Sequence, residues 1–374
     1  MPDARVSPEI RLRRIWSGQG SAVLRGALSA AAGAYRGALI ARKACYMAGL
    51  FSSERLPVPV VSIGNLTVGG SGKTPLAALV ATALGDLGAT PAIVSRGYGR
   101  RTRGVRVVAD REGVRLGAGD GGDEPRLLAE QLPGVPVVVG ESRYEAGRVA
   151  VERCGADALV LDDGFQHRTI MKDLEIVTVA GAEPWGNGRL FPRGILREPL
   201  SALRRAHVVV VTNPPTAAAR WEIVEVLHER GSEAQVLAGS YRPETLRAGD
   251  GGAALPPTTL AGRRVVAVAG LASPGGFAST LASLGAEVAE LVEFPDHHRY
   301  SVSDLERVRA AARRTGADRV VTTGKDWVRL REGPLSDIEW WVLSVRLDMA
   351  GDRARLVERL SDTLRRRASA RARP

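Results

Sequence analysis

Short, wholly apolar runs alternate with longer amphipathic segments along most of this chain. Strands that are apolar throughout, rather than at every second position, are typical of parallel sheets buried on both faces. Their alternation with helical patterns predicts an α/β fold with a mostly parallel sheet flanked by helices. Strands are expected at 91–95, 135–139, 158–161, 174–179, 208–212, 265–269 and 319–322, and helices at 76–87, 126–131, 143–153, 217–229, 276–284 and 303–315.

Residues 21–50 place apolar side chains at helical spacing, with Arg25, Arg36 and Lys43 beside that stripe. Their uninterrupted apolar runs are shorter than the roughly 20 residues that cross a bilayer, so we expect no transmembrane span. Two interpretations stay open for this amphipathic helix. It packs on the body of the protein, or it lies in a membrane interface with its cations toward anionic headgroups.

The same patterns suggest four parts. Residues 1–50 form the amphipathic helical segment, 51–214 a core lobe, and 215–360 a smaller C-terminal α/β lobe. Residues 361–374 are rich in arginine and are expected to be a disordered, solvated tail.

A glycine-rich turn between an apolar strand and a helix start carries the clearest chemical signal. It reads Gly69-Gly70-Ser71-Gly72-Lys73-Thr74-Pro75. Unpaired N–H groups at a helix start bind phosphates, a lysine here reaches the β- and γ-phosphates, and the following threonine hydroxyl takes Mg²⁺. The strict P-loop pattern has glycine where this chain has Thr67. The motif predicts a P-loop NTPase-type fold and a nucleotide triphosphatase or kinase.

Acidic residues follow two of the other expected elements. Asp162 and Asp163 come directly after an apolar strand, which is the arrangement that brings a carboxylate to the Mg²⁺ on a bound nucleotide. A turn or helix cap is the alternative for this pair. Asp123 opens an expected helix, where it can serve as the N-cap, and it is also a candidate base that accepts the proton of an alcohol.

Charge and composition narrow the class of partner. The formal net charge is +11, which implies attraction to nucleic acid, anionic lipid or a phosphorylated substrate. Only 5% of the residues are aromatic, which disfavours a nucleic-acid-binding module. The two cysteines, Cys45 and Cys154, lie far apart and indicate neither a disulfide framework nor a zinc site. A GTPase switch needs an N-K-x-D sequence, and Thr212-Asn213-Pro214-Pro215 is the nearest approach to it.

Taken together, these segments resemble the tetraacyldisaccharide 4′-kinases, the lipid A kinases of Gram-negative bacteria. Asp-Asp-Gly-Phe-Gln-His together with Gly-Asn-Gly-Arg is far more specific than a P-loop alone. The matching segments are 64–75, 95–100, 122–125, 162–167, 186–190, 196–199 and 296–298. The chain departs from the family at 191–196 and at Gly324, where glutamate is usual.

The resemblance implies transfer of the ATP γ-phosphate to the 4′-hydroxyl of a tetraacyldisaccharide 1-phosphate. It implies that the P-loop binds the phosphates and Mg²⁺, and that Thr74, Asp162 and Asp163 are ligands of the metal. It makes Asp123 the base, assisted by a histidine of the Asp296-His297-His298 run, for which we choose His297. Contacts to the anionic disaccharide are implied for Arg96, Arg143, Gln166 and His167.

A substrate with four acyl chains stays in the bilayer, so its kinase must reach the interface. The resemblance therefore favours the membrane interpretation of the N-terminal helix. We expect peripheral attachment to the cytoplasmic face of the inner membrane, where ATP is available, with the lipid A disaccharide precursor as substrate and no nucleic-acid partner. A P-loop ATPase or GTPase acting on another substrate remains the alternative.

Overall fold

The computed structural model describes residues 15–16, 19, 21–249, 251–271, 273–333 and 339–371. They fall into two compact units that interleave along the chain. Unit 1 holds the described residues of Met1–Lys73, Asp157–Ser240 and Met349–Pro374. Unit 2 holds those of Thr74–Ala156 and Tyr241–Asp348. The sequential lobes 51–214 and 215–360 stay a prediction, and residues 1–14 of the N-terminal segment lie outside the described residues.

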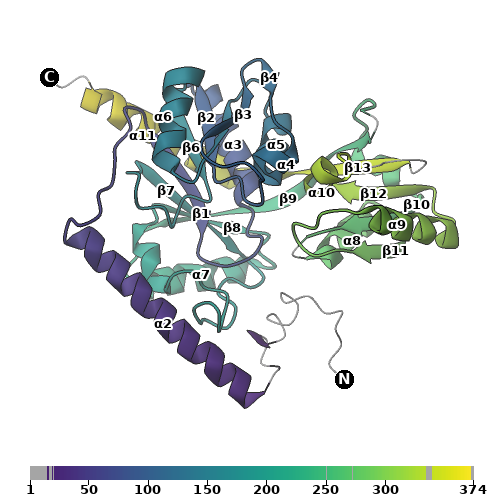
Figure 1. Cartoon of the computed structure of the whole chain (residues 1–374), viewed down its shortest axis with the longest axis horizontal. Helices are drawn as coiled ribbons and strands as arrows, with labels where there is room; N and C mark the ends of the chain where they lie inside the picture. Colours follow the sequence, from purple (N-terminus) through teal and green to yellow (C-terminus); the bar gives the residue numbers. More distant parts are fainter. Residues whose placement is uncertain are drawn as a thin grey trace. The chain divides into compact units, whose positions relative to one another are not determined.

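Parallel strands form the centre of unit 1 (Figure 1). Their order is β9-β8-β7-β1-β6, and the first half of β9 makes the pairing with β8. Almost every residue of β1, β6, β7 and β8 is buried, as their apolar runs require. The bounds are β1 (Val60–Asn65), β6 (Ala158–Asp162), β7 (Leu174–Ala180), β8 (Val208–Thr212) and β9 (Gln235–Ala248).

One face of this sheet is covered by a hydrophobic cluster. Phe165, Val177 and Val209 pack there with Ile223 and Leu227 of α7. The Thr216 hydroxyl caps α7 by accepting a hydrogen bond from the Ala219 N–H, which explains where that helix begins. The helical elements of the unit are α2 (Ala22–Met47), η1 (Leu200–Arg205), α7 (Ala217–Glu229), η3 (Ala350–Asp352) and α11 (Arg353–Arg371).

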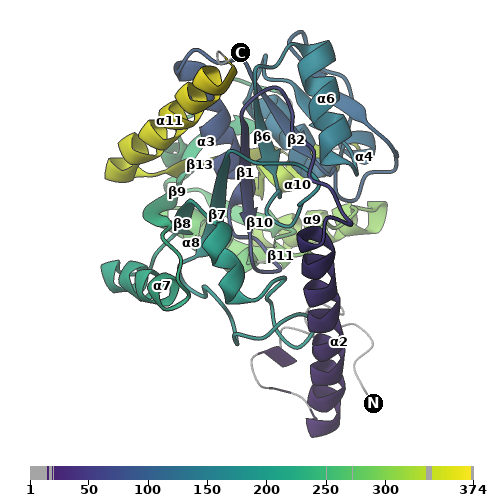
Figure 2. The same cartoon turned by 90° about the vertical axis from the view of Figure 1, so that its left-hand side faces the viewer.

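The N-terminal helix α2 is a long helix set apart from the β-sheet of unit 1 (Figure 2). The structure describes all its residues, and none of them is buried. It is tied to the unit by polar contacts, such as the Tyr35 hydroxyl that donates to the Arg197 carbonyl at 2.8 Å. The predicted helix is confirmed. Among the described residues, no helix is both long and apolar enough to cross a membrane.

The C-terminal helix α11 corrects the expectation of a disordered tail. The chain is helical through Arg371, whereas disorder was expected from residue 361. The arginine-rich composition misled that prediction because Leu356 and Leu360 anchor one face of the helix in the core. Farther along, Arg367 forms an ion pair with Asp173 at 3.8 Å. Residues 372–374 of the expected tail lie outside the described residues.

Unit 2 begins with the helix that follows the P-loop and then forms two groups of strands. In the first group, β2 pairs with β5 in parallel, and β3 is antiparallel to both β5 and β4. The bounds are α3 (Lys73–Asp86), β2 (Pro91–Ser95), β3 (Arg106–Asp110), β4 (Gly113–Val114), α4 (Ala118–Gly121), α5 (Asp123–Gln131), β5 (Val137–Val139) and α6 (Arg143–Cys154).

The second group of strands is wholly parallel, in the order β11-β10-β12-β13. Helix α10 leaves this group and packs against α5 of the first group, so that unit 2 has one continuous body. The bounds are η2 (Pro257–Leu260), β10 (Arg264–Ala269), α8 (Pro274–Ser283), β11 (Glu287–Glu293), α9 (Val302–Thr315), β12 (Arg319–Thr323), α10 (Gly324–Leu330) and β13 (Trp340–Asp348). The predicted mostly parallel α/β fold is confirmed.

Candidate active site

The glycine-rich turn lies at the carboxyl end of β1 and is anchored to its neighbouring strands. The Ser71 hydroxyl is buried and lies 2.8 Å from the Thr178 hydroxyl of β7. The Ser71 carbonyl accepts a hydrogen bond from the Thr212 hydroxyl of β8 at 3.3 Å. Gly69 and Gly72 have φ angles of 115° and 82°, which side chains rarely adopt. The turn is therefore fixed where ligands bind on parallel sheets.

Lys73, the first residue of α3, points at two polar groups of unit 1. Its Nζ lies 3.2 Å from an Asp163 carboxylate oxygen and donates to the Asn65 Oδ1 at 3.2 Å. Only 12% of its side chain is exposed. Thr74 and Pro75 follow in the first turn of α3 and are half-buried. The predicted lysine of the P-loop and Asp163, the second residue of the predicted acidic pair, are thus brought together.

Asp163 is held between two cations. Besides Lys73, the Arg197 guanidinium donates to both of its carboxylate oxygens, at 3.0 and 3.1 Å. Burial opposes the charged form, but Lys73 and then Arg197 outweigh it, so the pKa of Asp163 lies well below its ordinary value. The side chain keeps 35% of its surface exposed. Asp163 is therefore an ionised carboxylate that remains accessible to a ligand.

The backbone that presents Asp163 depends on a glycine in the adjacent strand. A Cβ at Gly64 would lie 2.5 Å from the Phe165 Cβ, so only glycine lets the segment after β6 approach β1. Asp162 ends β6 opposite Ile63 and is 1% exposed. Asp163 itself has a φ of 53°, which turns the chain away from the strand.

The residues predicted to hold Mg²⁺ offer the right kind of ligand. Mg²⁺ in phosphate sites binds one or two carboxylates and completes its shell with phosphate oxygens and water. Asp162, Asp163 and the Thr74 hydroxyl supply such oxygens. Within the described ranges, no three histidine, cysteine or acidic side chains are grouped so as to hold a metal by themselves. The donor set therefore fits a magnesium ion that arrives with a nucleotide.

A second polar cluster, in unit 2, surrounds Asp123. This residue is the first of α5, and its side chain is 8% exposed. Its carboxylate lies 3.0 Å from the His297 Nδ1 and forms a close ion pair with Arg329 of α10. The helix cap is Gly122 and not Asp123, so the capping interpretation of Asp123 is wrong. The structure joins Asp123 and His297, as the sequence analysis expected of the base and its assistant.

Cations lie beside both ring nitrogens of His297. The Lys325 Nζ is 3.4 Å from the Nε2. The Nδ1 faces both the Asp123 carboxylate and the Arg329 guanidinium. Burial opposes the charge of Lys325, but Glu124 and Asp296 outweigh it and raise the pKa of this lysine. Lys325 is therefore charged at neutral pH.

Arg329 supplies the second cation of this cluster. Its guanidinium also lies 2.8 Å from the His297 Nδ1 and donates to the His298 carbonyl at 2.9 Å. Burial lowers the pKa of Arg329 to about 10, which leaves it charged at neutral pH. Its positive charge stabilises the Asp123 carboxylate and fixes the segment that carries both histidines.

His298 points to other partners than His297. Its Nε2 lies 2.9 Å from an Asp304 carboxylate oxygen, and its ring stacks on Phe294 with centroids 4.9 Å apart. The two neighbouring histidines diverge because His297 has a φ of 60°. His298 therefore belongs to the capped start of α9, whereas His297 belongs to the Asp123 cluster.

The loop after β2 packs against the start of α5. A Cβ at Gly122, which has a φ of 91°, would lie 2.9 Å from the Gly97 Cα. Next to Gly97, the Tyr98 ring makes an edge contact with the His297 ring, with centroids 5.3 Å apart. Arg96 follows β2 directly and is exposed. This loop therefore forms one wall of the Asp123 cluster.

The other residues expected to contact the disaccharide have different surroundings. Gln166 donates from its amide to the Asn65 carbonyl at 2.8 Å, beside the contact of Asn65 with Lys73. His167 follows it and is half-buried. Arg143 begins α6, is fully buried, and donates to the Gly140 carbonyl at 2.7 Å. As placed, Arg143 is therefore a structural side chain of unit 2, and its role as a substrate contact stays a prediction.

Four polar residues of these clusters received no role in the sequence analysis. Asn65 and Arg197 surround Lys73 and Asp163, while Lys325 and Arg329 surround His297 and Asp123. Asn65 and Arg197 lie in segments that carried the family resemblance, so the resemblance could have indicated that they belong to the site. For Arg329 the sequence offered none, because its partners are far away along the chain.

Comparison with protein families gives one match that spans most of the chain. The family model described as "Tetraacyldisaccharide-1-P 4′-kinase" matches residues 24–365. Both polar clusters lie inside that range. The match therefore rests on much more than the P-loop.

Curated proteins and a solved structure agree with the family match. The chain is 45% identical to a tetraacyldisaccharide 4′-kinase of Anaeromyxobacter sp. (strain Fw109-5), with 90% of this chain and 91% of the relative covered. It is 48% identical to one from Anaeromyxobacter dehalogenans (strain 2CP-C), with 79% of each covered. A crystal structure of LpxK from Aquifex aeolicus, titled as an "apo" form in complex with ATP, aligns with a TM-score of 0.73 at 31% identity. That alignment covers 92% of this chain and 99% of the other.

Proposed function

The chain belongs to the tetraacyldisaccharide-1-P 4′-kinase family, and we propose that it transfers the γ-phosphate of ATP to the 4′-hydroxyl of a tetraacyldisaccharide 1-phosphate. The product is the 4′-phosphorylated lipid of lipid A biosynthesis. The observation that carries this proposal is the family match over residues 24–365, which contains both carboxylate clusters. A P-loop ATPase or GTPase with another substrate would not require that match.

Unit 1 supplies the groups that bind the phosphates. The turn from Gly69 to Gly72 offers its backbone N–H groups to the phosphate oxygens, and the Lys73 ammonium neutralises charge on the β- and γ-phosphates. Arg197 adds a second positive charge beside Lys73. Bound Mg²⁺ would be held by Thr74, Asp162 and Asp163, and it supplies charge neutralisation on the transferred group.

Unit 2 supplies the base. The 4′-oxygen of the sugar attacks the γ-phosphorus, the bond from that phosphorus to the bridging oxygen breaks, and ADP leaves. The proton of the 4′-hydroxyl passes to the Asp123 carboxylate. His297, whose Nδ1 lies 3.0 Å from the Asp123 carboxylate, and Arg329, which forms an ion pair with it, hold this carboxylate in place.

Recognition of the anionic disaccharide is assigned to the four residues that the resemblance implies. Arg96, exposed after β2, suits a glycosyl phosphate because a guanidinium binds phosphate oxygens with two parallel hydrogen bonds. Gln166 and His167 offer polar groups that follow β6 in unit 1, and Gln166 donates to the Asn65 carbonyl beside Lys73. Arg143 completes the set that the resemblance implies, and its burial makes it the weakest member.

We assign binding of the acyl chains and of the membrane surface to α2. The end of this helix and the residues after it expose apolar side chains, with Met47 77% and Leu50 73% exposed. A groove of about 460 Å³ runs between α2 and residues 188–201 of unit 1. It is lined by Leu190 and Leu200 and by arginines, among them Arg36 and Arg189. Apolar surface beside guanidinium groups suits a lipid with an anionic head and supports peripheral attachment to the cytoplasmic face of the inner membrane.

Transfer of label from γ-³²P-ATP to the lipid tests the proposed reaction. We expect a labelled product from tetraacyldisaccharide 1-phosphate and none from the matched lipid whose 4′-oxygen is already phosphorylated. Label released only as inorganic phosphate, with either lipid, would instead indicate an ATPase.

Flotation with liposomes tests the role of α2 separately. We expect the full chain to float with anionic liposomes, and a variant with Ile40→Asp and Met47→Asp to float less, because two exposed apolar contacts are lost. Val302→Asp, which changes an exposed apolar residue at the start of α9, serves as the matched control. Equal flotation of all three proteins would refute membrane binding by α2 and leave the kinase reaction untouched.

A further inference from the structure

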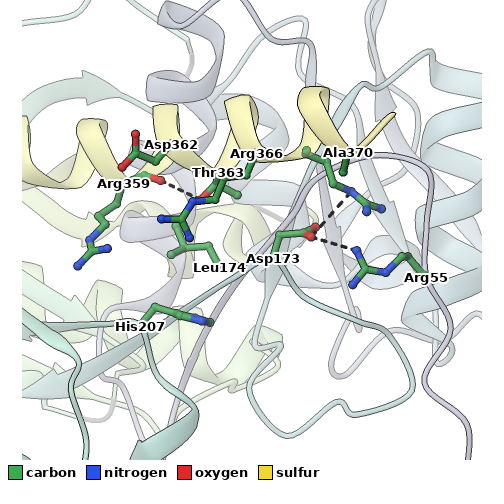
Figure 3. A pocket seen from close by; sticks show the side chains of 10 residues that line it. Arg55, Asp173, Leu174, His207, Arg359, Asp362, Thr363, Arg366 and Ala370 are labelled. Atoms are coloured by element: carbon green, nitrogen blue, oxygen red, sulfur yellow. Dashed lines mark hydrogen bonds and ion pairs between the residues drawn. The ribbon is translucent and has the colours of Figure 1, made fainter. Parts of the chain in front are cut away.

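A second basic cavity lies at the opposite edge of the unit 1 sheet from the P-loop. Its volume is about 210 Å³, and Figure 3 shows it between α11 and the residues that precede β7 and β8. Asp173 and His207 come directly before these two strands, at their amino ends. The P-loop follows β1 at the carboxyl ends of the parallel strands. The reaction derived above uses no residue of this cavity.

The charge of the cavity lining is predominantly positive. Four arginines line it, namely Arg55, Arg359, Arg366 and Arg367, against the two aspartates Asp173 and Asp362. One of these aspartates already has hydrogen-bond and ion-pair partners within the protein. Asp173 accepts from the Val60 N–H at 2.9 Å and pairs with Arg55 at 3.5 Å and with Arg367 at 3.8 Å. The remaining positive charge is therefore available to an anion.

The packing face of α11 changes character at this cavity. Along one stripe of the helix, Leu356 and Leu360 are fully buried in the core, and Thr363 and Arg367 then take the next places on the same stripe. If this face of α11 only packed against the core, apolar residues would be expected at these two positions as well. The change to polar residues coincides with the cavity, so this part of α11 faces a polar space rather than the core.

His207 contributes a donor on the sheet side of the cavity. Its Nδ1 accepts a hydrogen bond from the Glu175 N–H at 2.9 Å. The proton of the neutral ring is then on Nε2, which makes that nitrogen a donor. Arginine guanidinium groups together with an imidazole N–H are donors that match the oxygens of a phosphate group.

We propose that this cavity between α11 and the amino ends of β7 and β8 binds a phosphate-bearing anion. Its volume corresponds to about seven waters, at roughly 30 Å³ each, which is enough for a phosphate or diphosphate group. The anion is a free phosphate compound or the headgroup of an anionic phospholipid, since both present the same oxygens. The site goes beyond the proposed kinase reaction and does not depend on it.

Protection of arginines from chemical modification tests this site in the full chain. The P-loop is first saturated with a non-hydrolysable ATP analogue, so that it does not bind the probe. Phenylglyoxal modification of Arg359 and Arg366 is then followed by peptide mass spectrometry at increasing pyrophosphate concentration. Arg365, an exposed neighbour on α11 that does not line the cavity, is the internal control.

Pyrophosphate should slow modification of Arg359 and Arg366 along a saturable curve, to about a tenth or less, and leave Arg365 unchanged. A parallel arm compares phosphatidylglycerol vesicles with phosphatidylcholine vesicles. Selective protection by phosphatidylglycerol alone supports the site and identifies a headgroup as its ligand. No protection by any probe, or equal protection of Arg365, overturns the proposal.

Two matched variants give an independent readout. With the ATP analogue present, pyrophosphate should raise the Tm of wild type and of Arg365→Ala, and this shift should be lost in Arg366→Ala. Both substitutions remove one exposed arginine from the same helix. The same shift in Arg366→Ala as in wild type would contradict the assignment.

Discussion

The cluster of Lys73, Asp163 and Arg197 in unit 1 and the Asp123 cluster of unit 2 both place a carboxylate beside a cation, yet they suit different tasks. Asp163 keeps 35% of its side chain exposed and faces two basic side chains, Lys73 and Arg197. Asp123 is 8% exposed and faces Arg329 and an imidazole, which can gain or lose a proton. An exposed, strongly ionised carboxylate suits a metal or phosphate site. A buried carboxylate beside a histidine suits proton transfer.

Replacing Lys73 should disrupt the first cluster and give the largest loss of phosphate transfer. Lys73→Ala deletes a charge that acts on the transferred phosphate, so we expect transfer to fall by about 10²–10³-fold. The Kd for ATP should rise as well, measured with a fluorescent ATP analogue. Lys172→Ala, a buried lysine paired with Glu175 outside the P-loop, is the control for loss of a unit 1 lysine. An unchanged Kd and rate in Lys73→Ala would show that the turn does not bind the nucleotide.

Changing the histidine should weaken the second cluster and leave the first intact. For His297→Asn we expect kcat to fall by about 10- to 100-fold, because Asp123 loses the imidazole that assists it as a base. The Kd for ATP should stay the same. His298→Asn, the adjacent histidine that faces Asp304, is the matched control and should retain nearly full activity. A larger loss in His298→Asn than in His297→Asn would mean that the wrong histidine has been assigned.

Removing the charge of Asp163 should have the smallest effect of the three changes. The quantity affected is the free energy of unfolding. Its pKa is lowered in the folded chain, so its contribution is present above its unfolded pKa of about 3.9 and is lost as pH falls below that value. The carboxylate is partly exposed, and we expect a difference of about 1 kcal/mol or less between wild type and Asp163→Asn. Urea unfolding from pH 7 down to pH 3 measures it. A difference that grows in acid has the wrong sign for this account.

The first cluster could largely be predicted from the sequence, because its residues follow two strands in short motifs. Lys73 follows β1 after the glycine-rich turn, Asp163 comes directly after β6, and parallel strands bring their carboxyl ends to one edge. Arg197 could not be placed in the same way. It reaches Asp163 from a segment without regular secondary structure, whose path no local pattern describes.

The second cluster depends on tertiary packing that the sequence patterns do not contain. Asp123 and His297 are separated by 174 positions, and their pairing was reached through the family resemblance. Helix α10, which carries Arg329, was not predicted, although the Thr323 hydroxyl caps that helix. The strands β9, β11 and β13 were also missed, since polar residues interrupt β9 and β11 and the helix before β13 had not been identified.

The most direct test of the central claim compares phosphate transfer with ATP binding in Asp123→Asn. The account predicts that transfer from γ-labelled ATP to tetraacyldisaccharide 1-phosphate falls by about 10²–10⁴-fold, whereas the Kd for ATP stays within about twofold of wild type. Full turnover by Asp123→Asn would contradict the assignment of the base.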